Sequence, residues 1–394
     1  MKRFCIAILG LAVAAAAALS CAGDTGKVQM ATPSATSTPA VVGPVLLYTE
    51  TSLGDANAPP VDTLVAYDTG ANREVRRAAL PAEARAKTLT KSGTLIYVAA
   101  LSGSFEIRAI DPLTGDERRL YRAPDVTEWS IAVSPDGSQV AFAEIAAPGN
   151  AVSPPDTAVR ILDVRDGSTR TVATFQDPIS GAFRGRPVPR VWRDDGRGFV
   201  VSGDTSSGAP GGSATIMTDG TVINHLQGFG WPSPNGRYLA LQDLDDTGCV
   251  IGDVQRLRIF SLDGASVVAE VDDPARGIVM DDWSPDGQAL SYRRYAPKPG
   301  TATNDCIPDY DPASVRRFTL NVAGGDPVAV TDFNALQRAW YGDRVVELRC
   351  GDGSPPDIFG KCADPLPRSI LLNGVFVAKA DVSGILGFID TPAH

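Results

Sequence analysis

Aspartate is concentrated in two short stretches of the sequence. Calcium takes six to eight oxygen ligands, which closely spaced Asp side chains, glycines and backbone carbonyls can supply. Neither stretch has the spacing of an EF-hand loop, so solvated loop charge is the simpler interpretation and a calcium site is the alternative. The first stretch holds Asp243, Asp245 and Asp246, and the second holds Asp305, Asp309 and Asp311.

Few other residues are suited to catalysis. The sequence has two histidines, His225 and His394, and it contains no Cys-x-x-Cys, no Gly-rich phosphate loop and no Gly-x-Ser-x-Gly motif. A Ser–His–Asp triad needs a base, and His225 lies in "TVINHLQ", which is typical of an outer strand, so we expect it to be structural. We therefore expect a binding protein rather than an enzyme, with no resident cofactor unless calcium binds.

The N-terminus has the features of an export signal. A short basic start precedes the apolar run 4–19, which is shorter than the roughly 20 residues needed to span a bilayer. The next residues, "AALSCAGD", resemble the lipobox of bacterial lipoproteins, although Ala18 stands where that family prefers Leu. We predict that residues 1–20 are removed and that Cys21 carries the lipid, with ordinary secretion as the alternative. With a lipid on Cys21, the protein would be anchored in a membrane and face the periplasm or the cell exterior.

Residues 21–43 are rich in Ala, Thr, Ser, Pro and Gly and lack apolar periodicity, which predicts a flexible tether. The formal net charge is −10, and no basic run follows the N-terminus. Nucleic acid is therefore not an expected partner. We expect the lipid anchor to be the sole membrane contact of a monomeric protein.

Four cysteines remain after Cys5 and Cys21 are set aside. In an oxidising envelope an even set of cysteines is expected to pair. Three pairings are open, of which the local choice joins Cys350 to Cys362 and Cys249 to Cys306.

A turn motif repeats along the chain, as in "DDWSPDGQALSYRR" at 281–294. In Ser-Pro-Asp-Gly, Pro presets φ, Asp bonds the local backbone and Gly accepts positive φ, so the motif predicts a tight hairpin. Alternating apolar residues after each motif predict a strand. Related copies lie at 131–144, 191–204 and 230–243, and degenerate copies lie around Gly93 and Gly342.

A second Gly-containing turn follows in each unit, which gives four strands, a to d, joined by two tight turns and one variable b–c loop. Radial repetition of four antiparallel strands is typical of an all-β propeller. The "WSPDG" and "VSPDG" turns resemble the PD40 repeat of TolB-like, WD40-related propellers over about residues 44–390. Two copies depart from it, because 193–196 lacks the proline and Asn235 replaces Asp. The resemblance implies an envelope protein partner or a scaffold role.

Seven blades account for the chain best, with six as the alternative. The first unit lacks an inner strand, so we predict that the run 384–390 supplies it and closes the ring, leaving 391–394 as a tail. The predicted blades are 44–80, 86–123, 128–176, 188–226, 228–273, 277–332 and 336–382.

All five tryptophans precede predicted a–b turns, where we expect them to fill the space between blades; a cage for a ligand cation is the alternative. They are Trp129, Trp192, Trp231, Trp283 and Trp340.

Length variation is concentrated in the b–c loops, which share one face, and such a face is commonly the binding surface. The expected function is therefore that of a lipid-anchored envelope propeller that binds a protein partner through this face. The alternative is a lactonase- or lyase-like enzyme using the acidic loops and a metal ion in the central funnel.

Overall fold

The computed structural model is built from β-strands, and residues 40–394 form one compact unit. No helix in the part of the chain that it describes is long and apolar enough to cross a membrane. The structure describes residues 41, 43–52, 61–81, 84–101, 104–123, 130–145, 156–175, 186–204, 212–227, 230–242, 256–264, 266–273, 277–296, 298, 310–330, 335–341, 344–354, 356–357, 362, 367–380 and 382–390.

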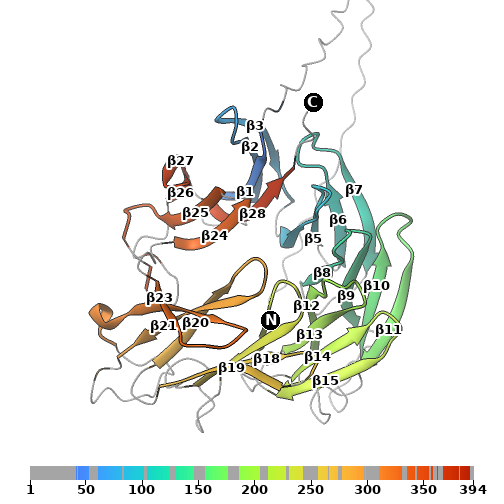
Figure 1. Ribbon diagram of the computed structural model, residues 1–394. Helices are drawn as coiled ribbons and strands as arrows, with labels where there is room; N and C mark the ends of the chain where they lie inside the picture. The colour runs from blue at the N-terminus through green and yellow to red at the C-terminus, as the bar shows by residue number, and fades with distance from the viewer. Residues whose placement is uncertain are drawn as a thin grey trace, which may run out of the picture. The chain divides into compact units, whose positions relative to one another are not determined.

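Seven four-stranded antiparallel sheets form the blades of a β-propeller (Figure 1). Blade 1 contains β28 (Val382–Ile389), β1 (Val45–Ser52), β2 (Val61–Asp68) and β3 (Arg73–Ala79), and blade 2 contains β4 (Ala84–Leu89), β5 (Leu95–Leu101), β6 (Ser104–Ile110) and β7 (Glu117–Ala123). Blade 3 contains β8 (Ile131–Val133), β9 (Gln139–Ile145), β10 (Thr157–Asp163) and β11 (Thr169–Phe175), and blade 4 contains β12 (Arg186–Trp192), β13 (Gly198–Asp204), β14 (Gly212–Met217) and β15 (Val222–Gln227).

Blade 5 contains β16 (Gly230–Pro232), β17 (Tyr238–Gln242), β18 (Arg256–Ser261) and β19 (Ser266–Asp272). Blade 6 contains β20 (Gly277–Trp283), β21 (Ala289–Tyr295), β22 (Arg316–Asn321) and β23 (Val328–Val330). Blade 7 contains β24 (Ala335–Tyr341), β25 (Arg344–Cys350), β26 (Arg368–Leu372) and β27 (Val375–Ala380). The prediction of seven blades is confirmed, and the six-bladed alternative is wrong.

The last strand of the chain completes the first blade. Strand β28 pairs antiparallel with β1, with Val45 opposite Ile389, and the two strands lie side by side in Figure 1. Val382 and Ile385 of β28 are buried. The predicted closure by the C-terminal run is confirmed, and it covers the edge that β1 would otherwise expose.

Glycine at the a–b turns serves both conformation and packing. Gly236 and Gly287 have φ of 65° and 67°, a region that side chains with a Cβ rarely adopt. A Cβ at Gly236 would lie 2.8 Å from the Cα of Arg193, and one at Gly287 would lie 2.6 Å from the Nδ2 of Asn235. The turn of each of these blades therefore packs against the turn of the blade before it, which leaves no room for a side chain.

The departure from the motif at Asn235 has a structural role. Its Oδ1 accepts hydrogen bonds from the Ser233 hydroxyl at 2.6 Å and the Arg237 amide at 3.0 Å, as the aspartate of the motif would. Its Nδ2 donates to the carbonyl oxygen of Asp286 at 2.8 Å, a bond that aspartate could not make. The amide thus keeps the turn of blade 5 intact and joins it to blade 6.

Two of the tryptophans occupy the predicted positions between blades, and one does not. Trp192 and Trp283 are 3% and 8% exposed and belong to apolar clusters shared by blades 3 and 4 and by blades 5 and 6. Trp231 is 43% exposed, so its predicted burial is wrong. Trp283 fills the space between blades 5 and 6 and donates its Nε1 hydrogen to the Trp231 carbonyl at 3.1 Å, so that junction is already filled. Trp129 and the side chain of Trp340 lie outside the described residues.

Candidate functional site

One of the six predicted aspartates is described, and it caps a helix. Asp311 is the N-cap of the 3₁₀-helix η1 (Pro312–Ser314), and its carboxylate accepts a hydrogen bond from the Ala313 amide at 2.9 Å. This bond satisfies a free N–H group at the start of the helix. Within the described ranges, no group of three or more Cys, His, Asp or Glu residues is placed to hold a metal ion. The other predicted positions, Asp243, Asp245, Asp246, Asp305, Asp309, Cys21, Cys249 and Cys306, lie outside the described residues.

A disulfide joins Cys350, at the end of β25, to Cys362, with 5.6 Å between the two Cα atoms. Cys350 is 1% exposed. The disulfide closes a loop of the chain between the b and c strands of blade 7, so it constrains the chain between the end of β25 and the start of β26.

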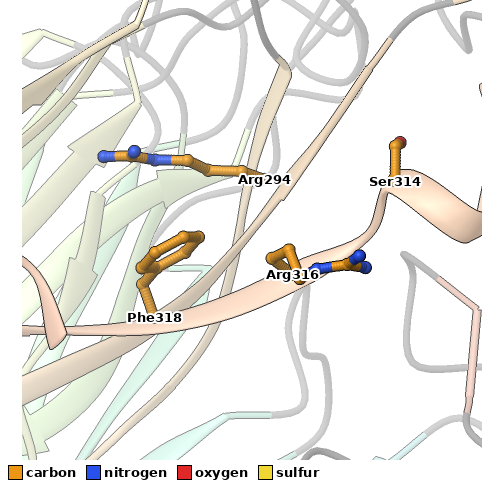
Figure 2. Close-up of a pocket in the computed structure, with 4 residues that line it drawn as sticks. All are labelled: Arg294, Ser314, Arg316 and Phe318. Atoms are coloured by element: carbon orange, nitrogen blue, oxygen red, sulfur yellow. The ribbon is translucent and has the colours of Figure 1, made fainter. Parts of the chain in front are cut away.

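A pocket opens at the base of the b–c loop of blade 6. Its volume is about 270 Å³, and Arg294, Ser314, Arg316 and Phe318 line it. Arg294 lies near the end of β21, Ser314 in η1, and Arg316 and Phe318 at the start of β22. Figure 2 shows the Arg294 side chain lying over the Phe318 ring, with Arg316 and Ser314 on the other side of the pocket. The pocket therefore combines two cationic side chains with an aromatic wall on the predicted recognition face.

Aromatic rings hold Arg294 in place. Its guanidinium carbon lies 4.7 Å from the centroid of Phe318 and 5.6 Å from that of Tyr292, distances suited to cation–π attraction. Its Nη2 donates to the Tyr292 hydroxyl at 3.1 Å, and its Nη1 lies 3.6 Å from a carboxylate oxygen of Asp273. Burial raises the pKa of Tyr292, so this phenol stays protonated. Arg294 thus has a fixed orientation and is partly neutralised by Asp273.

Arg316 is the less constrained cation of the pocket. It is exposed, and its Nη1 donates to the carbonyl oxygens of Ala313 at 2.8 Å and Val315 at 2.7 Å. In the described part of the chain, its other guanidinium N–H groups have no partner. The Ser314 hydroxyl closes the base of the loop, because it accepts from the Ala296 amide at 2.8 Å. Arg316 therefore presents free donors from a well-anchored backbone.

A second pocket, of about 350 Å³, lies where a–b turns and inner strands of blades 2 to 6 meet. Its two carboxylates are already bonded within the turns. Arg237 contacts the Asp194 carboxylate at 2.9 Å, and the Ser284 hydroxyl and Gln288 amide donate to Asp286, which lowers the pKa of Asp286. These carboxylates therefore stabilise the turns.

The sequence analysis did not identify Arg294, Arg316 or Phe318. The sequence offers only the alternation of side chains in "SYRRY" and "RRFTL", which predicts two strands but not how they pair. Pairing of β21 with β22 places Tyr292 opposite Phe318 and Arg294 opposite Arg316. Only that register brings the two arginines and two aromatic residues onto one face of the sheet.

No family model and no curated protein matches this chain. Similar solved structures include TolB from Acinetobacter baumannii, with 14% identity, a TM-score of 0.42, and coverage of 72% of this chain and 62% of TolB. They also include the acylaminoacyl peptidase of Pyrococcus horikoshii, with 10% identity, a TM-score of 0.53, and coverage of 86% of this chain and 53% of the peptidase.

An oligogalacturonate lyase from Vibrio parahaemolyticus is also similar, with 12% identity, a TM-score of 0.44, and coverage of 79% of this chain and 95% of the lyase. The chain spans less than two thirds of the length of the TolB and peptidase chains. At 10% identity the similarity to the peptidase, whose TM-score is above 0.5, concerns the fold alone, and the function must be argued from the site.

Proposed function

We propose that this protein is a lipid-anchored, cell-envelope β-propeller that binds a protein partner through the face carrying its b–c loops. The observation that carries the proposal is the pocket formed by Arg294, Arg316 and Phe318 at the base of the blade 6 loop. The lipobox-like "AALSCAGD" and the tether at 21–43 support the proposed export and anchoring.

The chemistry of the pocket suits an acidic side chain or a terminal carboxylate of the partner. Arginine and aromatic residues are enriched at the energetic centres of protein interfaces. Arg316 has free donors for a carboxylate, and Arg294 is already held over Phe318, so little side-chain entropy is lost on binding. The volume of about 270 Å³ is below the roughly 300–1,000 Å³ usual for small-molecule sites, which favours one inserted side chain.

The test is crosslinking of the full-length protein in cells of the source organism, followed by mass spectrometry. The Arg316→Glu variant reverses the free charge of the pocket, and its native partners are backbone carbonyls of its own loop, so folding should survive. The matched control is Arg118→Glu, at an exposed position on β7 of blade 2. We expect a partner protein to be crosslinked to the wild type and to the control. The amount of this partner recovered with the Arg316→Glu variant should be at least tenfold lower.

If the same amount of the partner is recovered with the Arg316→Glu variant as with the wild type, this pocket is not the site that contacts the partner. Absence of any protein partner from all three samples would contradict a protein-binding function and turn attention to a small ligand. The proposed anchor is tested separately, because Cys21→Ser should move the protein from the membrane fraction to the soluble fraction.

A further inference from the structure

The exposed apolar side chains of the described residues lie at one end of the blades. Because successive strands are antiparallel, the a–b and c–d turns of a blade lie at the same end of its sheet, and we call this end the turn face. Among the described residues, six of the seven exposed large apolar side chains occupy the first or second position of an outer strand, directly after a c–d turn. We call these six residues the apolar rim: Val222 and Ile223 of β15, Val267 of β19, Val328 of β23, and Val375 and Phe376 of β27.

The apolar rim is limited to four consecutive blades, blades 4 to 7. Single exposed apolar residues are ordinary on a protein surface, but these residues recur at one structural position in neighbouring blades. The same position is polar or charged in blades 1 to 3, so the turn face has an apolar side and a polar side. The residues at that position in blades 1 to 3 are Arg73 and Glu74 of β3, Glu117 and Arg118 of β7, and Thr169 and Arg170 of β11.

The outer strands leave the apolar rim open to solvent. Successive side chains of a strand point to opposite sides of the sheet, yet the consecutive residues Val375 and Phe376 are 68% and 58% exposed. Blade 7 is therefore uncovered on both sides at this point. The seventh exposed apolar residue, Trp231, lies two residues before Ser233, where the a–b turn of blade 5 begins, so it also lies near the turn face.

The chain enters the propeller at the turn face as well. The Gly43 amide donates to the Asp68 carboxylate at 3.1 Å, and a Cβ on Gly43 would lie 2.8 Å from the backbone nitrogen of Gly70 in the c–d turn of blade 1. The predicted tether at 21–43 therefore joins the propeller on this face, and a flexible chain of that length spans about 25 Å. A membrane that holds the far end of the tether is closer to the turn face than to the b–c loops.

A lipid surface suits the apolar rim better than a protein partner does. The core of a protein interface is a closely packed apolar patch, whereas c–d turns with aspartates separate the rim residues of neighbouring blades. Separate apolar and aromatic side chains can each enter the boundary between lipid headgroups and acyl chains. Acidic turns are repelled by anionic lipids, which favours a zwitterionic surface. The aspartates in these turns are Asp219, Asp263 and Asp326.

We propose that the turn face of blades 4 to 7 docks on a zwitterionic lipid surface, with the apolar rim in the headgroup region. This adds a second membrane contact to the lipid anchor and directs the b–c loop face away from the membrane. The proposal deepens the proposed function and rests on its membrane attachment. The experiment therefore supplies an attachment that does not depend on Cys21.

A fluorescent label on the outer strands tests the proposal. Residues 1–20 are replaced by a hexahistidine tag, which tethers the chain to vesicles of phosphatidylcholine and phosphatidylethanolamine through a nickel-chelating lipid. The fluorophore NBD, whose emission rises outside water, is attached through an unnatural keto amino acid at Val267 or Phe376. Both are the second residue of their strand, and the matched control is Arg118, the second residue of β7 in blade 2.

We expect tethering to raise the NBD emission about threefold at Val267 and Phe376, and doxyl-labelled lipid to quench it, with no change at Arg118. Val328→Asp/Val375→Asp should reduce the rise at Val267 by about half, because two of the six rim side chains become charged. These side chains are 67% and 68% exposed, so folding should survive. The control variant Arg118→Asp should leave the rise unchanged.

Three results would overturn the proposal: unchanged emission at Val267 and Phe376, an equal rise at all three positions, or a rise that requires anionic phosphatidylglycerol. Failure of the natural anchor would appear elsewhere, in the fractionation of Cys21→Ser. Separate apolar side chains alone give only reversible membrane binding, so that fractionation still tests the anchor.

Discussion

Replacing Asn235 by the aspartate of the repeat should destabilise the protein, although restoring a repeat consensus is commonly stabilising. The introduced carboxylate keeps the bonds from Ser233 and Arg237 but loses the donor to the Asp286 carbonyl. Loss of one such bond costs about 0.5–1.5 kcal/mol, and a carboxylate oxygen placed against a carbonyl oxygen adds repulsion. We expect Asn235→Asp to lower the free energy of unfolding by about 1–2 kcal/mol at pH 7.

Urea unfolding followed by circular dichroism measures this change. The penalty should shrink below about pH 4, where the introduced carboxyl group becomes protonated and can donate again. The matched control is Asp286→Asn in blade 6, where Oδ1 accepts from Ser284 and Gln288 in the same geometry, so a smaller change is expected. An Asn235→Asp protein as stable as wild type at pH 7 would refute the claim that the amide joins blades 5 and 6.

Three further predictions concern the disulfide, ring closure and acid stability. The double variant Cys350→Ser/Cys362→Ser should lower the free energy of unfolding by about 3 kcal/mol, because the bond closes a loop with a sequence separation of 12 residues and so reduces the entropy of the unfolded chain. Guanidinium unfolding measures this change, and no change would mean that the unfolded chain is already constrained. Ile385→Ala in the closing strand, where the side chain is 4% exposed, should cost about 2–5 kcal/mol in the same assay, and a cost below 1 kcal/mol would argue against tight closure by β28. Bonds from the Ser134 hydroxyl and Ser138 lower the pKa of Asp136, so its stabilising effect is present above about pH 4 and is lost as the pH falls through its folded-state pKa. In Asp136→Asn, melting temperature should therefore fall less steeply between pH 5 and pH 2 than in wild type, and parallel curves would contradict this.

The blade pattern was predictable because it depends on local chemistry. Turn glycines and alternating strands determine where each hairpin lies, and the predicted first and last blades, 44–80 and 336–382, match strands that run from Val45 to Ala79 and from Ala335 to Ala380. The closing strand was predictable for the same reason, since an unpaired apolar run remained. The exposure of Trp231 was not predictable, because it depends on the neighbouring Trp283 occupying the space between the blades.

The candidate site was not predictable to the same extent, because it depends on register between strands that are distant in sequence. Arg294 and Phe318 become neighbours only through the pairing of β21 with β22. The buried ion pairs of Asp281 with Arg293 and Arg317 were harder still to predict, since a charged strand face does not indicate which blade it meets. Arg293 is 3% exposed, a burial that a charged residue at an alternating position would not suggest.

The pocket and the buried ion pairs of Asp281 with Arg293 and Arg317 lie on opposite faces of the pairing of β21 with β22. Tyr292, Arg294 and Phe318 face the pocket side of β21 and β22, whereas Arg293 and Arg317, which are directly opposite each other in the ladder, face blade 7. Because successive side chains alternate, a slip of one residue would exchange the two faces. The register of β21 against β22 therefore determines the proposed recognition pocket and the buried ion pairs of Asp281 together.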